Sequence, residues 1–146
     1  MAQMIHALKD HMKTQTQDSK TRILIADDHE SVRKGLHLIL ESRENLEVVG
    51  EAANGKEAID RSRQLQPDVI IMDLKMPILD GLAAAQVIKK ARPQTAILMF
   101  SMRTSRLFTE IMENMGMDGF VSKENDSAAL LTAIDAVTHH QKYFPA

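Results

Sequence analysis

Apolar and polar residues follow two alternating spacings from residue 22 onward. Five short runs are rich in β-branched and other apolar residues, which is typical of β-strands. Three of them, ILIA, DVIIMD and AILMFS, are apolar without alternation, a pattern typical of strands buried on both faces. The five predicted strands span residues 23–26, 46–52, 68–73, 96–101 and 119–122.

Apolar residues at helical spacing occupy the segments between and after these strands. Four clear stripes each predict one amphipathic helix: Val32, Leu36, Ile39 and Leu40; Ala84, Val87, Ile88 and Ala91; Phe108, Ile111, Met112 and Met115; Leu130, Ala133, Ile134 and Val137. A fifth segment, 55–65, has a weaker stripe, but Asn54 and Glu57 suit an N-cap with a capping-box acid. Gly116 suits a helix C-terminal cap.

Five strands that alternate with five helices predict an α/β protein whose parallel sheet is covered by helices on both faces. With 146 residues, 44% of them hydrophobic, the chain is long enough for one domain with its own core. We assign residues 22–140 to that domain. Residues 1–21 are expected to be a flexible extension, with a short self-association helix as the alternative. Residues 141–146 are expected to begin a linker to an effector domain absent from this chain.

Charge and composition exclude several functions. The formal net charge is −2, so no overall field attracts nucleic acid or an anionic membrane. The absence of cysteine excludes disulfides, thiol catalysis and thiolate metal sites, and suits a reducing compartment, so we expect a cytoplasmic protein. No apolar run approaches the roughly 20 residues that a transmembrane helix needs, and no membrane partner is expected.

Complementary polar side chains follow four of the predicted strands. Asp27 and Asp28 follow the first strand and Asp73 ends the third, while Ser101 ends the fourth and Lys123 follows the fifth. The carboxyl ends of parallel strands meet at one edge of a sheet, so these groups should converge. Two carboxylates about 4 Å apart repel by about 4 kcal/mol, and a cluster with only oxygen ligands favours Mg²⁺. A hydroxyl and an ammonium beside such an ion suit a phosphoryl group, with Asp73 as the nucleophile that forms an acyl phosphate.

Four motifs at these strand ends resemble the receiver domain of bacterial two-component response regulators. They are ILIADD at 23–28, MDLKMPILDG at 72–81, MFSMR at 99–103 and GFVSK at 119–123. The resemblance covers residues 22–140, and the ending HHQKYFPA is most similar to the NarL/FixJ (LuxR-type) subfamily. It implies a three-layer αβα sandwich of the flavodoxin-like, CheY-like (βα)5 type, with a five-stranded parallel sheet in the order 2-1-3-4-5.

The resemblance also implies a role for each residue at the sheet edge. Asp73 would accept the phosphoryl group from the phosphohistidine of a sensor histidine kinase or a phosphotransfer protein. Mg²⁺ would be bound by Asp28, Asp73 and the backbone carbonyl of Lys75, with Asp27 acting through water. Lys123 would pair with the phosphoryl oxygens.

Ser101 and Phe120 match the family's two switch positions. Ser101 would hydrogen-bond the phosphoryl group, and Phe120 would then turn inward. The surface formed by the fourth helix, the fifth strand and the fifth helix would change as a result. Phe120 lacks the hydroxyl of the commoner tyrosine, so packing alone would set its position. Glu124 stands where many receivers have a proline, so the peptide bond after Lys123 is expected to be trans.

Other polar residues receive simpler interpretations. Lys75 and Arg103, each two residues beyond a site residue, are expected to flank the entry for attacking water and to slow loss of the phosphoryl group. Asp80 with Gly81 is interpreted as a turn. The histidines show no ligand spacing with the acids and are interpreted as surface or linker residues: His6, His11, His29, His37, His139 and His140.

These features predict a signalling switch rather than an enzyme, with transcription as its output. The alternative is a receiver-like module that binds a partner without phosphorylation. Whether the chain forms a homodimer is left undecided by the sequence. The two candidate interfaces are the first and last helices, and the fourth and last helices. DNA would be reached only through an effector domain absent from this chain. A haloacid-dehalogenase-like phosphatase is disfavoured because Lys75 stands where a second aspartate is needed, and no P-loop motif is present.

Overall fold

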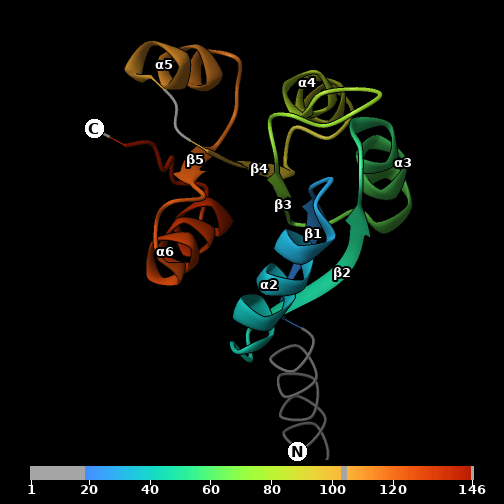
Figure 1. The fold of residues 1–146 in the computed structure, drawn as a ribbon, viewed down its shortest axis with the longest axis vertical. Coiled ribbons are helices and arrows are strands. Elements are labelled where there is room, and N and C mark those ends of the chain that lie inside the picture. The colour runs from blue at the N-terminus through green and yellow to red at the C-terminus, as the bar shows by residue number, and fades with distance from the viewer. Residues whose placement is uncertain (1–18, 103–104, 146) are drawn as a thin grey trace, which may run out of the picture.

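The computed structural model describes residues 19–102 and 105–145 as an α/β sandwich of three layers (Figure 1). Its elements in chain order are β1 (Thr21–Ala26), α2 (Glu30–Glu41), β2 (Leu46–Ala52), α3 (Gly55–Leu65), β3 (Val69–Met72), α4 (Gly81–Ala91), β4 (Ala96–Ser101), α5 (Arg106–Asn114), β5 (Gly119–Ser122) and α6 (Ser127–Thr138). All strand pairs are parallel, in the order β2-β1-β3-β4-β5. The predicted fold class and strand order are therefore confirmed. The proposed self-association helix near the N-terminus and Arg103 lie outside the described residues.

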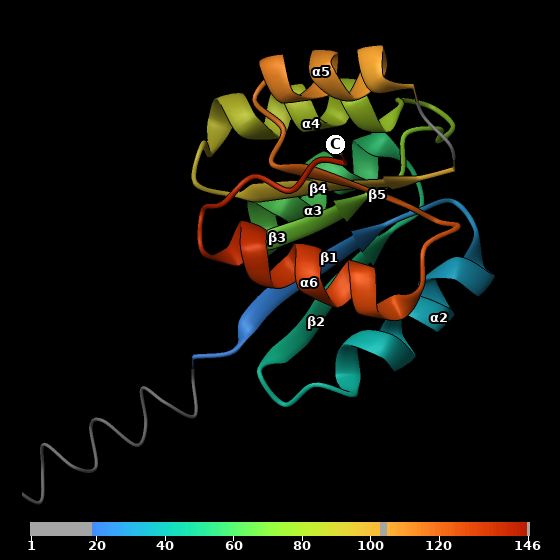
Figure 2. The ribbon, with the colours of Figure 1, turned by 90° about the vertical axis from the view of Figure 1, so that its left-hand side faces the viewer.

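The sheet divides the hydrophobic core into two halves. Figure 2 shows α2 and α6 on one face of the sheet and α3, α4 and α5 on the other. Successive residues of a strand point to opposite faces, so Ile23 and Ile25 of β1 join the α2 and α6 half, whereas Leu24 and Ala26 join the other half. All four residues of β3 are buried, which confirms the interpretation of its unbroken apolar run.

Side-chain caps begin four of the five described helices. Each cap accepts a hydrogen bond from the backbone N–H three residues later, and the four capping residues are Asn54, Asp80, Ser105 and Asp126. Helix α2 differs, because His29 occupies its N-cap position and makes no side-chain cap hydrogen bond. At the other end of a helix, Gly116 follows α5 with a φ of 91°, as its predicted capping role requires.

Three residues of the predicted apolar stripes are exposed rather than buried: Val87, Ala91 and Ile111. Val87 of α4 and Ile111 of α5 are each 41% exposed. Helix α4 packs on the sheet through the small residues Ala84 and Ala85 together with Ile88, so Val87 lies beyond the contact. The spacing predicted the helices correctly but overestimated the width of their buried faces.

The loop between β3 and α4 is held close to the end of β3. A Cβ atom on Gly81 would lie 1.7 Å from the carbonyl oxygen of Asp73, so only glycine lets α4 begin here. In the same loop Ile78 has a φ of 71°, which β-branched residues rarely adopt. The loop after Asp73 is therefore both tightly packed and strained. Among the described residues, no helix is long and apolar enough to cross a membrane.

Candidate functional site

The carboxyl ends of β1, β3, β4 and β5 border a cleft of about 1140 Å³. Asp28, Asp73, Ser101 and Lys123 all line it. These side chains come from segments far apart in the sequence, and the parallel sheet places them together because each follows or ends a strand. The cleft is therefore the place where the chemistry expected from the sequence can occur.

Asp73 is a buried acid at the end of β3. Its side chain is 4% exposed, and its backbone N–H donates to the carbonyl oxygen of Ala26 at 2.9 Å. Burial raises the pKa of Asp73, and the nearby charge of Asp27 raises it further. The Lys123 ammonium and a backbone hydrogen bond from Lys75 offset only part of this rise in the pKa. The neighbouring positive charge therefore does not fully offset the cost of ionising this buried carboxylate.

Lys123 lies between the two buried carboxylates. Its Nζ atom is 2.7 Å from Oδ2 of Asp27 and 3.3 Å from Oδ2 of Asp73. Burial alone would lower the pKa of Lys123, but the hydrogen bond from its ammonium to Asp27 and the two negative charges outweigh burial and raise the pKa. Its backbone N–H donates to the carbonyl oxygen of Ser101 at 2.7 Å, which fixes the start of the side chain. The side chain of Lys123 therefore stays protonated and positively charged in the site.

Asp27, Asp28 and Asp73 form an acidic cluster that also includes His29. One possible ligand atom from each of the four lies within 4.8 Å of the others. Nδ1 of His29 is 3.1 Å from a carboxylate oxygen of Asp27 and 3.1 Å from one of Asp28. His29 is a surface residue as interpreted, with its side chain 64% exposed, but its ring also lies beside the acids, which the sequence spacing did not indicate. The tight turn after β1, where the backbone N–H of His29 donates to Asp27 at 2.9 Å, brings the ring back to the cluster.

This donor set fits a divalent cation. Three carboxylates supply the oxygen ligands that Mg²⁺ prefers, and negative charges this close together favour a cation among them. Asp27 is 1% exposed, whereas the side chain of Asp28 is 30% exposed and faces the cleft opening. Because the Lys123 ammonium is closer to Asp27, at 2.7 Å, than to Asp73, at 3.3 Å, Asp28 and Asp73 are the carboxylates best placed to hold an ion.

Arg33 positions Asp27 in a way that sequence reasoning missed. Its Nη1 atom donates to the backbone carbonyl of Asp27 at 2.7 Å, and its Nε atom donates to Glu51 of β2 at 3.0 Å. The guanidinium thus links α2, the turn after β1 and the neighbouring strand. No local signal announces this contact, since Arg33 lies six residues along the chain from Asp27.

The two predicted switch residues lie at different depths. Ser101 is 9% exposed and borders the cleft. Phe120 is 3% exposed and is not among the residues that line the cleft. It pairs with Met99 in the β4–β5 ladder, two positions before the Ser101–Ser122 pair. Phe120 therefore lies inward, below the rim on which Ser101 sits.

Three further predictions concern residues in and beside the cleft. Lys75 lines the cleft, with an exposed side chain. No cis peptide bond occurs in the described residues, so the peptide bond after Lys123 is trans, as predicted. Asp80 is the side-chain cap of α4, in agreement with its interpretation as a turn residue.

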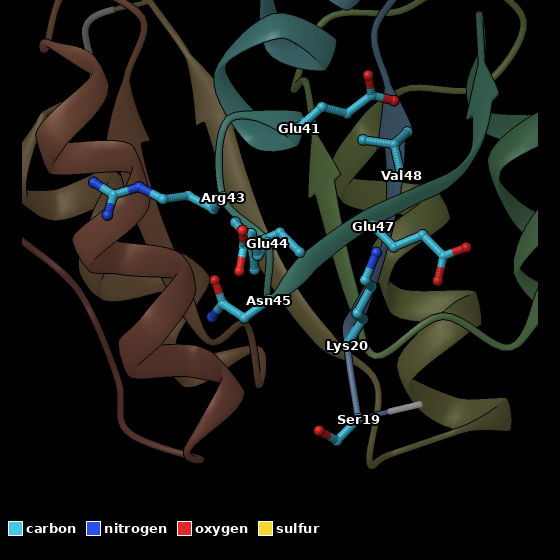
Figure 3. A pocket seen from close by; sticks show the side chains of 9 residues that line it. Ser19, Lys20, Glu41, Arg43, Glu44, Asn45, Glu47 and Val48 are labelled. Carbon is cyan, nitrogen blue, oxygen red and sulfur yellow. The ribbon is translucent and has the colours of Figure 1, made fainter. Parts of the chain in front are cut away.

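A second hollow, of about 930 Å³, lies at the start of β1 and β2, away from this cleft. Figure 3 shows that the charged side chains of Glu41, Arg43 and Glu47 around it point in different directions. Because these groups do not converge, this hollow offers no chemistry comparable to that of the cleft.

The fold and the site together define a receiver domain. The chain belongs to the response regulator receiver domain family, which matches residues 23–135. The chain is 37% identical over 115 residues to the transcriptional regulatory protein YdfI of Bacillus subtilis (strain 168). The aligned region covers 79% of this chain and 54% of that protein. The chain spans about half the length of the curated relatives that it matches first.

Solved structures agree with this assignment. The chain is similar to a two-component response regulator of the LuxR family from Aurantimonas sp. SI85-9A1, with a TM-score of 0.81, 34% identity and coverage of 86% of this chain and 89% of that one. It is also similar to the isolated REC domain of RcsB from Salmonella enterica serovar Typhimurium, with a TM-score of 0.79, 29% identity and coverage of 86% and 94%. The expected likeness to LuxR-type regulators is confirmed.

Proposed function

We propose that this chain is a phosphoacceptor switch in which Asp73 takes a phosphoryl group from a sensor histidine kinase or a phosphotransfer protein. The observation that carries the proposal is the position of Asp73, buried at the sheet edge with Lys123 at 3.3 Å and with two more carboxylates beside it. A buried acid with a raised pKa has little structural value at a strand end. A site that must bind a cation and then an anion accounts for it.

The transfer follows from the groups in the cleft. A carboxylate oxygen of Asp73 attacks the phosphorus atom, and an O–P bond forms as the bond between phosphorus and the imidazole nitrogen of the donor phosphohistidine breaks. The imidazole keeps the electron pair and takes up a proton from solvent. The ammonium of Lys123, already at the rim, is positioned to pair with the phosphoryl oxygens. The product is an acyl phosphate on Asp73.

Asp28 and Asp73 would hold Mg²⁺, together with the backbone carbonyl of Lys75 and with Asp27 through water. When bound, the ion would neutralise negative charge on the cluster and on the incoming phosphoryl oxygens. His29 adds an imidazole nitrogen next to the same carboxylates. Arg33 keeps Asp27 in place through its backbone carbonyl.

The response is a two-state change in packing. Ser101 would hydrogen-bond the phosphoryl group, and the inward position of Phe120 would be favoured as a result. Driving such a switch from 1:99 to 99:1 takes about 5.5 kcal/mol, more than one hydrogen bond of about 1 kcal/mol provides. The charge-assisted contacts of Lys123 and the bound ion therefore have to contribute. Lys75 and Arg103 would flank the route of attacking water and lengthen the life of the acyl phosphate.

Control of transcription is the output that the relatives suggest. YdfI is named as a transcriptional regulatory protein, and another structural neighbour, with 29% identity and a TM-score of 0.79, shows two RcsB dimers bound to DNA. By analogy, this chain would act as a signalling switch that changes its own association or that of an attached effector domain. DNA would be reached through such an effector domain.

Binding of the phosphoryl mimic beryllofluoride tests the proposal. The similar REC domain of RcsB was solved in the presence of this mimic. In calorimetric titrations with Mg²⁺ and beryllofluoride, the wild-type chain is expected to bind and Asp73→Asn is expected to show no binding. Asp80→Asn is the matched control, because Asp80 lines the same cleft but caps α4. Unchanged binding by Asp73→Asn, or no binding by the wild-type chain, would leave only the phosphorylation-independent interaction module.

A further inference from the structure

The chain after α6 turns back and lies along the free edge of β5. Figure 2 shows this segment passing in front of β5, between α5 and α6. Tyr143 forms a parallel bridge with Gly119. The backbone N–H of Tyr143 donates to the carbonyl oxygen of Asp118 at 2.9 Å, and its carbonyl oxygen accepts from the N–H of Phe120 at 2.8 Å. We refer to residues 141–145 as the strap.

The side chains of the strap alternate as those of an edge strand do. Tyr143 packs against the core half under α2 and α6, which includes Val121. Phe144 packs against the other half, which includes the switch residue Phe120. Lys142 adds a hydrogen bond of 3.0 Å from Nζ to the carbonyl oxygen of Met117. The strap is thus held by both backbone and side-chain contacts.

Gly119 makes the close approach of the strap possible. A Cβ atom at this position would lie 2.7 Å from the carbonyl oxygen of Tyr143 and 3.2 Å from its Cβ atom. The contact with the carbonyl oxygen is shorter than real Cβ atoms allow, and the contact with the Cβ atom is tighter than most. Since Leu98 Cδ1 would also lie 2.9 Å away, a larger residue would press on the strap from one side and on the core from the other. The edge of β5 is therefore shaped for this segment.

We propose that the strap is coupled to Asp73 through Phe120, and that phosphorylation favours the seated strap. The inference rests on the proposed function of Asp73. With the strap seated, Phe120 is 3% exposed and lies in the same cluster against which Phe144 packs. An outward Phe120 would leave that cluster and remove part of the surface on which Phe144 rests.

The coupling has a consequence for partners. An unpaired strand edge can accept a strand from another chain, and the seated strap already uses the N–H of Phe120 and the carbonyl oxygen of Asp118. A partner that adds a strand to β5 must displace the strap. Phosphorylation of Asp73 therefore closes this edge to such partners, and the unphosphorylated chain leaves it easier to open.

Reciprocity provides the first test. If phosphoryl binding favours the seated strap, then complete unseating of the strap must weaken binding of the mimic by the same factor, and partial loss of its contacts must weaken binding in the same direction. In calorimetric titrations of the full chain with Mg²⁺ and beryllofluoride, Phe144→Ala is expected to raise the Kd about fivefold or more. Gly119→Ala, which obstructs the strap by a different route, is expected to change the Kd in the same direction. Leu38→Ala, at a residue of α2 that is 77% exposed, is the control and should leave the Kd unchanged.

Tyrosine fluorescence provides the second test. The chain has one tyrosine and no tryptophan, so its intrinsic fluorescence reports on Tyr143 in the strap. Adding Mg²⁺ and beryllofluoride to the wild-type chain is expected to change this emission and to slow amide exchange at Tyr143 and Phe120. Neither change is expected in Asp73→Asn.

The outcomes separate the two proposals. If the wild-type chain binds the mimic while both strap variants keep the wild-type Kd, the coupling is wrong and the phosphoacceptor assignment stands. If the wild-type chain fails to bind the mimic at all, both proposals are wrong. Weaker binding by Phe144→Ala and Gly119→Ala, with Leu38→Ala unaffected, supports the coupling.

Discussion

Asp73 is held where its ionised form is costly. Its side chain is 4% exposed, and the carboxylate of Asp27 lies in the same cluster, within 4.8 Å by ligand atoms. At an effective dielectric near 20, a like-charge pair at such a distance repels by about 3 to 4 kcal/mol. Burial and this repulsion together outweigh the attraction of Lys123, so the pKa of Asp73 remains raised. Ionised Asp73 therefore lowers the stability of the chain.

This cost predicts that Asp73→Asn stabilises the chain at neutral pH in metal-free buffer. An acid whose folded-state pKa lies above its unfolded value lowers the free energy of unfolding when ionised, and the loss is relieved as the pH falls through the raised pKa. We expect a gain of on the order of 1 kcal/mol at neutral pH, shrinking toward zero in acid. Thermal unfolding followed by circular dichroism across this pH range measures it. A difference that does not depend on pH, or a less stable variant, would contradict the explanation.

Most of the candidate site could be predicted at the level of single residues, because the end of a strand in a parallel sheet is a location that sequence can specify. Asp28, Asp73, Ser101 and Lys123 all follow from that rule and lie in one cleft. His29 could not be predicted by spacing, since its approach depends on the shape of one turn. The contact of Arg33 depends on how α2 packs.

At the scale of elements, two glycines in helices have opposite effects on stability. Gly81 begins α4 where a Cβ atom would lie 1.7 Å from the carbonyl oxygen of Asp73. Gly35 lies within α2, and a Cβ atom there would meet nothing within 4 Å. The first glycine is required by contact, whereas the second carries only the entropic cost of glycine in a helix.

We therefore predict opposite outcomes for the two alanine substitutions. Gly35→Ala should raise the free energy of unfolding by about 0.5 to 1 kcal/mol, because alanine is the better helix former. Gly81→Ala should lower it by about 2 to 4 kcal/mol, because α4 must move away from the loop after β3. Chemical denaturation of both variants beside the wild type measures the two changes. Similar changes in both would show that the contact at Gly81 is not decisive.

The elements themselves were predictable because strands and helices leave different periodicities. Helix 55–65 was predicted with the bounds observed for α3, and β1 begins at Thr21, two residues before its apolar run. The strap could not be predicted in this way. Residues 141–145 are too few to show a period, and only the folded β5 edge reveals that Tyr143 and Phe144 point to opposite halves of the core.

At the scale of the whole molecule, the two ends of the sheet have different roles. The carboxyl ends of the strands carry the cleft, whereas at the amino ends structural contacts join β1 to the end of α3 and to the loop before β3. Arg22 of β1 donates from Nη1 to the carbonyl oxygens of Leu65 at 2.7 Å and Gln66 at 3.0 Å, which ends α3. Its backbone N–H donates to Asp68 at 2.8 Å. This end should contribute to stability without contributing to phosphoryl chemistry.

Arg22→Met tests this division. The substitution removes the charged hydrogen bonds to the end of α3, so we expect the free energy of unfolding to fall by about 1 to 3 kcal/mol. The Kd for beryllofluoride with Mg²⁺ should stay within about twofold of wild type, since the cleft lies at the far end. Arg61→Met, at an exposed residue of α3, is the matched control for loss of an arginine. A large change in the Kd with Arg22→Met would show that the two ends are coupled.

The missing cap of α2 limits how this protein can be engineered. Serine or aspartate in place of His29 would supply a capping oxygen worth about 1 kcal/mol. Serine, however, would take away the imidazole that lies 3.1 Å from two carboxylates, and aspartate would crowd a further anion against them. A thermostable version of this chain is therefore better sought elsewhere on α2, since at position 29 a gain in helix stability and an intact acidic cluster are competing demands.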